Sequence, residues 1–316
     1  MDKISLTDIK GLSVGHWEDP INLTGCTVIL APEGVTASVH CPGFAPASHE
    51  SDLLNPEKTV ELIHGLVLAG GSSFGLSAAA GVVRYLREQG IGLDTGAVKV
   101  PLVPGAAIYD YPFNLSGGTL PNDSSGYEAA KNASTRPVTS GRYGAGKSAA
   151  SGKLGGLNAS SPSGLGSYGV AEDEIMVAAL AVVNPLGSIL DPLTSQIISG
   201  LKRPDGGLAN KEEILSSLRH LSATNDEGFP SNTVLVVVAT NARLSKLGCR
   251  RLAMMASAGL ARSIYPAHLL FDGDTVFALS NNQGPETDPS WLGARAADAV
   301  ALAIADSAYA LTQTRT

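Results

Sequence analysis

Hydrophobic and polar positions follow two kinds of pattern along the chain. Short apolar runs rich in β-branched residues predict strands at residues 26–30, 35–40, 66–68, 98–103, 177–183, 233–238 and 275–279. Longer segments with helical spacing predict helices at residues 74–87, 211–221, 246–264 and 291–311. Because some strands are sequence neighbours and others alternate with helices, we expect a layered α/β protein with mixed or antiparallel sheets.

Two stretches lack either pattern. Residues 116–126 are polar and rich in turn-forming residues, and residues 140–169 are mainly Gly, Ser and Ala, with Lys147 and Lys153 as prominent charges. The second stretch has two interpretations that the sequence leaves open. It is either a linker between domains, or a set of loops and strands whose small residues allow close approach to a ligand. Residues 1–316 are compatible with one large α/β domain.

Composition narrows the classes of function. The chain carries a formal net charge of −7 and no basic run longer than Arg250-Arg251, so nucleic acid is not an expected partner. The first residues lack the apolar stretch of a signal peptide, no apolar run reaches membrane-spanning length, and the 3 cysteines are scattered. These features predict a cytoplasmic protein without a membrane partner. The 6 histidines form no HxH or HxxxH pair, and we expect neither a metal nor another cofactor.

The segment from Gly141 to Ser148 matches the phosphate-binding pattern GxxxxGK[ST]. That motif requires a buried strand before it and, after it, a helix whose amides face the phosphate. Here residues 132–140 are polar and contain Pro137, and residues 149–156 are interrupted by glycine. We therefore interpret the match as a coincidence of glycine richness.

A polar, turn-rich segment at residues 225–232 leads directly into the apolar strand predicted from Thr233 onward. A cut between Asn232 and Thr233 would place a free α-amine and a hydroxyl at the head of a buried strand. Such an amine has an ordinary pKa of about 7.7–8.0, so it can take the hydroxyl proton near neutrality. Before the cut, the hydroxyl can attack the Asn232 carbonyl and form an ester that water opens. Taken alone, the junction is more typical of a turn that enters a strand through a threonine.

Eight short motifs in a fixed order carry a resemblance to a known family. They are GLSVGH at 11–16, TGCTV at 24–28, LAGGSSFGL at 68–76, AIYD at 107–110, GAG at 144–146, VNPLG at 183–187, SNT at 231–233 and DGDT at 272–275. In this order the set resembles the DmpA-type aminopeptidases, a family of N-terminal-nucleophile hydrolases that includes the nylon-oligomer hydrolases. The resemblance covers nearly the whole chain.

This resemblance implies an αββα sandwich that cleaves itself into residues 1–232 and 233–316. The two parts are expected to stay associated and to form homo-oligomers. It also implies one pocket in which Thr233, released from Asn232, is the nucleophile. The other catalytic positions expected around that pocket are Lys153, Asn184, Tyr109, Asp272 and Asp274.

Two of these side chains are candidate donors to an oxyanion. The Asn184 amide can stabilise a developing negative charge, but the same residue before Pro185 also suits a polar turn. The Tyr109 hydroxyl can add a second donor, although a core tyrosine often only reaches the surface with its hydroxyl. The glycine-rich segment 68–76 can place backbone amides at the pocket, or form a tight turn from strand to helix.

The charged candidates also have alternatives. The Lys153 ammonium can favour ionisation at the nucleophile or be a solvated loop charge, and Lys147 can fill the same role. Asp272 and Asp274 are two residues apart, so an extended chain places both carboxylates on one face. There they can orient the hydroxyl and ammonium of Thr233 or attract a substrate amine. Asp272-Gly273 is equally a turn signal.

The threonine and the Asp-Gly-Asp pattern favour the nylon-oligomer branch of the family, because the aminopeptidase branch typically carries serine and Ser-x-Glu at these places. We therefore expect a small amide or oligoamide substrate, such as a 6-aminohexanoate oligomer. An aminopeptidase or amidase acting on short peptides, amino-acid amides or esters is the alternative. Acyl transfer to an amine and a non-catalytic binding or assembly module are further alternatives.

Overall fold

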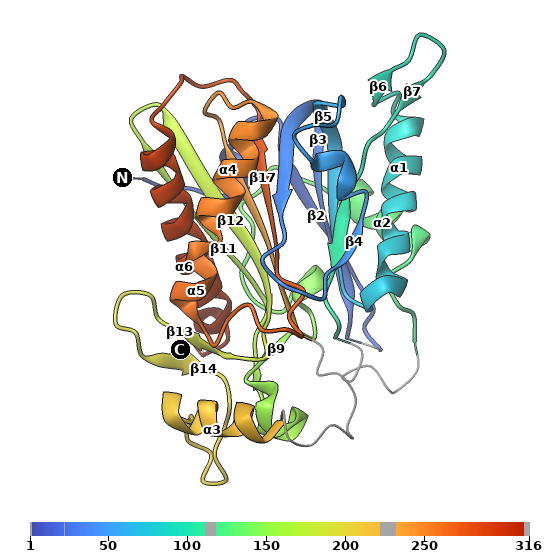
Figure 1. The fold of residues 1–316 in the computed structure, drawn as a ribbon. Coiled ribbons are helices and arrows are strands. Elements are labelled where there is room, and N and C mark those ends of the chain that lie inside the picture. The colour runs from blue at the N-terminus through green and yellow to red at the C-terminus, as the bar shows by residue number, and fades with distance from the viewer. Residues whose placement is uncertain (1, 22, 111–117, 222–231, 313–316) are drawn as a thin grey trace.

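The computed structural model describes residues 2–21, 23–110, 118–221 and 232–312 (Figure 1). Two layers of β-strands pack face to face, and helices cover both outer sides. One outer layer contains α4 (Lys246–Ala256), α5 (Ala258–Ser263) and α6 (Pro289–Thr312), and the other contains α1 (Ala78–Glu88) and α2 (Asp123–Lys131). The predicted αββα sandwich is confirmed.

One long strand, β3 (Gly25–His40), belongs to both sheet layers. Residues 25–30 of this strand pair with β2 and residues 36–40 pair with β17. Its pairing with β5 covers residues 26–30 and 35–36, with a register shift between Leu30 and Val35. The first layer has the order β1 (Asp2–Lys3), β11 (Leu165–Glu172), β12 (Ile175–Asn184), β15 (Thr233–Thr240), β17 (Thr275–Ser280), β3. The second comprises β2 (Ser13–Glu18), β3, β5 (Leu62–Ala69), β8 (Gly105–Ala107) and β4 (Ala47–His49).

The pairing is mixed, as the sequence predicted. Strands β15 and β17 are parallel, as are β5 and β8, and the other pairs in these layers are antiparallel. Smaller sheets lie at the ends of the sandwich. They are β6 (Leu93–Asp94) with β7 (Lys99–Val100), β9 (Ala150–Ser151) with β10 (Ser161–Pro162), and β13 (Ser188–Leu190) with β14 (Ile197–Ser199) and β16 (Ile264–Tyr265).

The surroundings of strand β15 explain why its residues 234–239 are all apolar. Leu235 and Val237 point into the core between the two sheets, whereas Val234, Val236 and Val238 pack against the α4–α6 layer. All five side chains are fully buried. Because successive residues of a strand face opposite sides, a strand covered on both faces needs a continuous apolar run. The head of this strand is therefore held rigidly inside the molecule.

Several predicted boundaries change in the structure. The predicted strands 26–30 and 35–40 are one strand, and the predicted helix 246–264 divides into α4 and α5 before β16. Most of the predicted strand 98–103 lies outside regular structure, apart from the short β7. The turn-rich segment 116–126 leads into α2, whose start is capped by the Asn122 side chain accepting from the Ser125 amide at 3.2 Å. Residues 140–169 are not a linker, because they contribute β9, β10 and most of β11 to the fold.

Helix α3 (Lys211–Leu221) lies at the end of the sandwich where β13 and β14 also lie (Figure 1). It packs on a separate small apolar cluster made by Leu154, Leu186, Leu201, Ala209 and Ile214. The segment 222–231, which contains most of the predicted linker before Thr233, lies outside the described residues.

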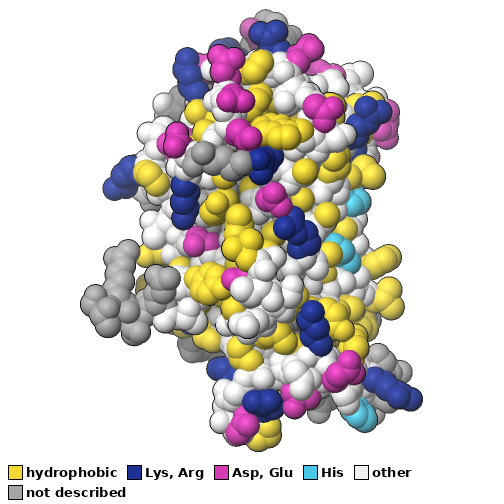
Figure 2. All heavy atoms as spheres, turned by 90° about the vertical axis from the view of Figure 1, so that its left-hand side faces the viewer, with side chains coloured by type: hydrophobic (Ala, Val, Ile, Leu, Met, Phe, Trp, Pro, Cys, Tyr) yellow, Lys and Arg dark blue, Asp and Glu magenta, His cyan; other side chains and the backbone are white. Residues whose placement is uncertain are grey.

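Figure 2 shows the side of the molecule that lies on the left of Figure 1, where α6 forms the surface. Positive and negative side chains are interspersed on this face and do not gather by sign. Within the described part of the chain, no helix is both long enough and apolar enough to cross a lipid bilayer.

Candidate active site

Thr233 is the first residue of β15, and its neighbours are the predicted site residues of the adjacent strands. Asn184, the last residue of β12, lies directly across from Thr233. Asp272, just before β17, pairs with Asn232 in a parallel bridge. Because β12 is antiparallel to β15 and β17 is parallel to it, the end of β12 and the starts of β15 and β17 meet at one edge. The topology thus brings together residues up to 88 positions apart, from Asn184 to Asp272.

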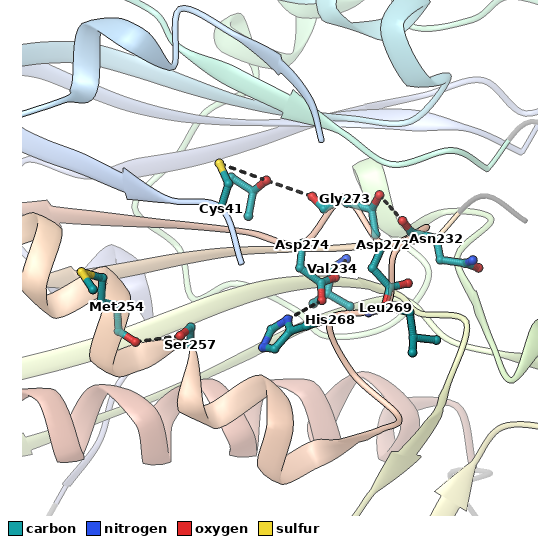
Figure 3. Close-up of polar contacts among 12 residues, drawn as sticks. Cys41, Asn232, Val234, Met254, Ser257, His268, Leu269, Asp272, Gly273 and Asp274 are labelled. Atoms are coloured by element: carbon teal, nitrogen blue, oxygen red, sulfur yellow. Dashed lines mark hydrogen bonds and ion pairs between the residues drawn. The ribbon is translucent and has the colours of Figure 1, made fainter. Parts of the chain in front are cut away.

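The peptide bond between Asn232 and Thr233 is enclosed by polar groups. Thr233 Oγ1 donates a hydrogen bond to the Asn232 carbonyl oxygen at 2.5 Å. The backbone N–H of Gly273 donates to the same oxygen at 2.9 Å (Figure 3). Asn232 and Thr233 are only 2% and 5% exposed. The hydroxyl therefore lies beside the carbonyl of its own peptide bond, and a backbone amide is aimed at the oxygen where charge would develop.

The two carboxylates of the Asp-Gly-Asp motif have different surroundings. Asp274 Oδ1 accepts from the Val234 N–H at 2.9 Å, and its Oδ2 lies 2.8 Å from His268 Nδ1. Asp272 Oδ2 accepts from the Leu269 N–H at 2.7 Å, whereas its buried Oδ1 has no hydrogen-bond partner among the described residues. Burial, and then the charge of Asp274, raise the pKa of Asp272 to about 7.

Lys153, which is partly buried, and Asn184, which is fully buried, form a polar pair. Lys153 Nζ donates to Asn184 Oδ1 at 2.9 Å and to the Asn184 carbonyl at 3.0 Å. The Asn184 side chain also accepts from the Ala150 N–H at 3.1 Å and donates to the Tyr109 carbonyl at 3.1 Å. Loss of water around the Lys153 ammonium lowers its pKa to about 7, although the charges of Asp272 and Asp110 act in the opposite direction.

Gly152 shows how the glycine-rich stretch positions this lysine. It has a φ of +73°, and a Cβ there would lie 1.8 Å from the Leu201 backbone nitrogen. Its own N–H donates to the Gly187 carbonyl at 2.8 Å, and the Lys153 N–H donates to the Leu186 carbonyl at 3.0 Å. Small residues are needed here because backbone packs directly on backbone. That packing presents the lysine to Asn184.

The alternative lysine is engaged elsewhere. Lys147 Nζ forms a salt bridge with Glu18 at 2.6 Å. The amides of the preceding turn are also taken by protein groups, because Gly144 N–H donates to Glu18 Oε1 and Ala145 N–H donates to Thr27 Oγ1. The phosphate-like motif is therefore a structural turn, and Lys153 is the lysine that contacts Asn184.

Tyr109 contacts the site through its backbone carbonyl, and the donor role of its hydroxyl stays a prediction. The next residue, Asp110, was given no role from the sequence, although it stands in the same motif. Its fully buried carboxylate accepts from Thr24 Oγ1 at 2.7 Å and from the Gly71 N–H at 2.6 Å. Burial raises the pKa of Asp110 despite these hydrogen bonds. The Gly71 amide in segment 68–76 thus holds a carboxylate of the protein itself.

His268 and the Gly273 amide were also not identified from the sequence. The only local signal for His268 is its position in the loop that carries the acidic pair, and a backbone amide has no signature at all. Among the described residues, no group of three or more His, Cys, Asp or Glu side chains is arranged to hold a metal ion.

Comparisons with known proteins show the family to which the chain belongs. Residues 5–315 match the model of Peptidase family S58. An "uncharacterized aminopeptidase" of Mycobacterium tuberculosis is 38% identical, over 95% of this chain and 92% of the relative. The 6-aminohexanoate-oligomer endohydrolase of Kocuria sp. is 30% identical, over 93% of this chain and 80% of the relative. The L-aminopeptidase D-Ala-esterase/amidase of Ochrobactrum anthropi, a variant of the Ntn hydrolase fold, superposes with a TM-score of 0.69 at 18% identity, over 97% and 86% of the two chains.

Proposed function

Because the chain belongs to Peptidase family S58, the family predicted from its motifs, we propose that it is a self-processing amide hydrolase whose nucleophile is Thr233. Family membership and relatives support hydrolysis of amide or peptide bonds in general. The single observation that carries the finer proposal is the hydrogen bond of 2.5 Å from the Thr233 hydroxyl to the Asn232 carbonyl. In the intact chain the nucleophile already lies against the bond that would be cut.

This geometry supports self-processing by the following steps. The Thr233 oxygen attacks the Asn232 carbonyl carbon, and the Gly273 N–H stabilises the negative oxygen of the tetrahedral intermediate. The C–N bond breaks, the nitrogen takes the proton that the Thr233 hydroxyl gives up and becomes the α-amine of Thr233, and Asn232 remains as an ester on the Thr233 oxygen. Water then opens the ester. Residues 1–232 end in a carboxylate, and residues 233–316 begin with the free amine.

Substrate hydrolysis repeats the same chemistry with an external amide. The α-amine takes the hydroxyl proton while the oxygen attacks the substrate carbonyl, and the proton then leaves with the departing amine. One N–H of the Asn184 amide is engaged by the Tyr109 carbonyl, which leaves the second for the substrate oxyanion. Lys153 donates to the backbone carbonyl of Asn184 and to its side-chain oxygen, and thereby fixes the orientation of the Asn184 amide. We assign Lys153 to this positioning role.

The substrate we favour is a linear amide such as a 6-aminohexanoate oligomer. The threonine nucleophile, the Asp-Gly-Asp motif and the 30% identity to the Kocuria endohydrolase support it. The 38% identity to the mycobacterial aminopeptidase supports the second candidate, hydrolysis of short peptides or amino-acid amides.

Homo-oligomers are part of the same proposal. Helix α4 exposes Leu247, Met254 and Met255 at 47%, 50% and 36%, which gives the helical layer apolar surface for contact between copies. The molecular mass of the native protein measured by light scattering tests this point, because a single chain has a mass of 32.3 kDa.

Mass spectrometry of the purified protein under denaturing conditions tests the central proposal. Wild type and Thr233→Ser should each yield two fragments that meet between Asn232 and Thr233, whereas Thr233→Ala should remain intact and inactive. The processed enzyme is then assayed with 6-aminohexanoate oligomers and with amino-acid p-nitroanilides to separate the two substrate classes. An intact wild-type chain that hydrolyses amides would remove the Thr233 amine from the mechanism.

A further inference from the structure

The acidic pair is held by two consecutive residues of one loop. His268 presents its ring to Asp274, and the N–H of Leu269 donates to Asp272 (Figure 3). His268 has a φ of +55°, in the left-handed region that non-glycine residues seldom adopt. The backbone adopts this conformation where the His268 ring faces Asp274 and the Leu269 amide donates to Asp272.

Asp274 connects that loop to the nucleophile strand. One of its oxygens faces His268 Nδ1 at 2.8 Å, and the other accepts from the N–H of Val234, the residue after the nucleophile, at 2.9 Å. Since Asp274 is 2% exposed, water does not replace either donor readily. If the histidine donor were lost, the carboxylate could rotate away from Val234 or take up a proton.

The two carboxylates differ in how well their charge is stabilised. Asp274 has a partner on each oxygen, whereas Asp272 has one donor and one buried oxygen without a hydrogen bond. Close carboxylates do not ionise independently, and the proton stays on the member with fewer donors. In this pair that member is Asp272.

We propose that His268 is a positioning residue of the active site, which donates from Nδ1 to Asp274, fixes that carboxylate against the nucleophile strand and keeps the exchangeable proton of the pair on Asp272. This inference rests on the proposed role of Thr233. It adds a residue from the loop before the acidic motif to the machinery that orients the nucleophile.

The role proposed for His268 requires a hydrogen bond to Asp274 and not a positive charge. The charged and titratable groups around His268 are the carboxylates Asp272 and Asp274 and, at the end of β3, His40, which itself lies near Arg250 on α4. A neutral imidazole with its proton on Nδ1 already supplies the donor that Asp274 needs. A neutral side chain with an N–H at the same place should therefore replace the histidine.

Three variants test the proposal: His268→Ala, which removes the donor, His268→Asn, which keeps an N–H, and His49→Ala, an exposed histidine as control. We expect His268→Ala to process itself more slowly and to lose kcat by about 10–100-fold with little change in KM, the usual effect of removing a partner that orients a functional group. The acidic limb of its pH–rate profile should move to higher pH, because Asp274 then binds a proton more readily. His268→Asn should restore most of both properties, and His49→Ala should match wild type.

Thermal unfolding of the same variants separates positioning from a general loss of stability. A wild-type kcat and pH profile in His268→Ala would overturn the inference. Equal losses of activity in the Ala and Asn variants, in proportion to lowered Tm, would also overturn it. If His268→Ala does not fold, the pH profile of His268→Asn still decides. These outcomes differ from failure of the proposed function, in which Thr233→Ala would keep its activity.

Discussion

At the scale of single residues, Gly273 donates its backbone amide to the Asn232 carbonyl, and its lack of a side chain leaves room for the Thr233 hydroxyl. A Cβ at this position would lie 2.7 Å from Thr233 Oγ1 and 2.7 Å from the Ala45 carbonyl, closer than real contacts allow. We therefore expect Gly273→Ala to displace the nucleophile and slow self-cleavage by about 10²-fold. The intact fraction in a time course of denatured masses measures this rate. Gly248→Ala on α4, where the nearest atoms are side-chain carbons at 3.3 Å, is the matched control; equal rates in both variants would contradict the geometry.

The raised pKa of Asp272 predicts how stability depends on pH. Its native carboxyl holds a proton up to about pH 7, whereas the unfolded one releases it near the ordinary value of 3.8. Between these values the native state binds more protons, so the contribution of this group to the free energy of unfolding falls as pH rises. In a Thr233→Ala background, the Tm of the Asp272→Asn variant minus the Tm of its parent should therefore increase as the pH rises from about 4 to about 7. Parallel Tm curves would show that Asp272 titrates normally.

At the scale of elements, α3 supports the site from outside the sandwich. Its fully buried Ile214 packs in the small cluster with Leu154, which follows Lys153, and with Leu186, whose carbonyl accepts from the Lys153 N–H. Ile214→Ala should remove about 2–5 kcal/mol from this local packing. We expect this variant to lose a large fraction of kcat/KM with only a small decrease in Tm, since the cluster is separate from the main cores. Ile304→Ala, an equally buried isoleucine of α6, should do the reverse. The same ratio of losses in both variants would contradict a local role for α3.

Helices and strands with a strong hydrophobic pattern could be predicted from the sequence, and those with a weak pattern could not. β12, β15 and β17 are buried on both faces and therefore have continuous apolar sequences. α2 was missed because Ser and Gly dominate its first turn, although Asn122 and Ser125 have the spacing of a helix cap. β11 was missed because glycine allows close backbone contact there: a Cβ at Gly166 would lie 1.9 Å from the Ala303 carbonyl in α6. Tertiary packing, not local propensity, decides such segments.

At the scale of the whole molecule, the candidate site depends on strand order. Motifs identified Thr233, Asn184 and the acidic pair, but their meeting point requires β12 and β17 to lie on either side of β15, and residue patterns alone do not determine that order. His268 acts through Asp274, and the Gly273 amide acts through the backbone, so neither has a recognisable signature. Residues whose role is to orient other groups can be identified only from a three-dimensional structure.

The same strand order predicts how the two parts behave after cleavage. β15 and β17 belong to residues 233–316, yet they lie between β12 and β3 of residues 1–232. Separation would expose Val236 and Phe277, both fully buried, along with their neighbours, at about 1.5–3 kcal/mol for each large apolar side chain. The fragments should therefore co-elute in native size-exclusion chromatography and separate only in denaturant. They should also unfold in one transition at the same temperature by circular dichroism and by tryptophan fluorescence. Elution of free 233–316 under native conditions would mean that the interleaved sheet does not hold the processed enzyme together.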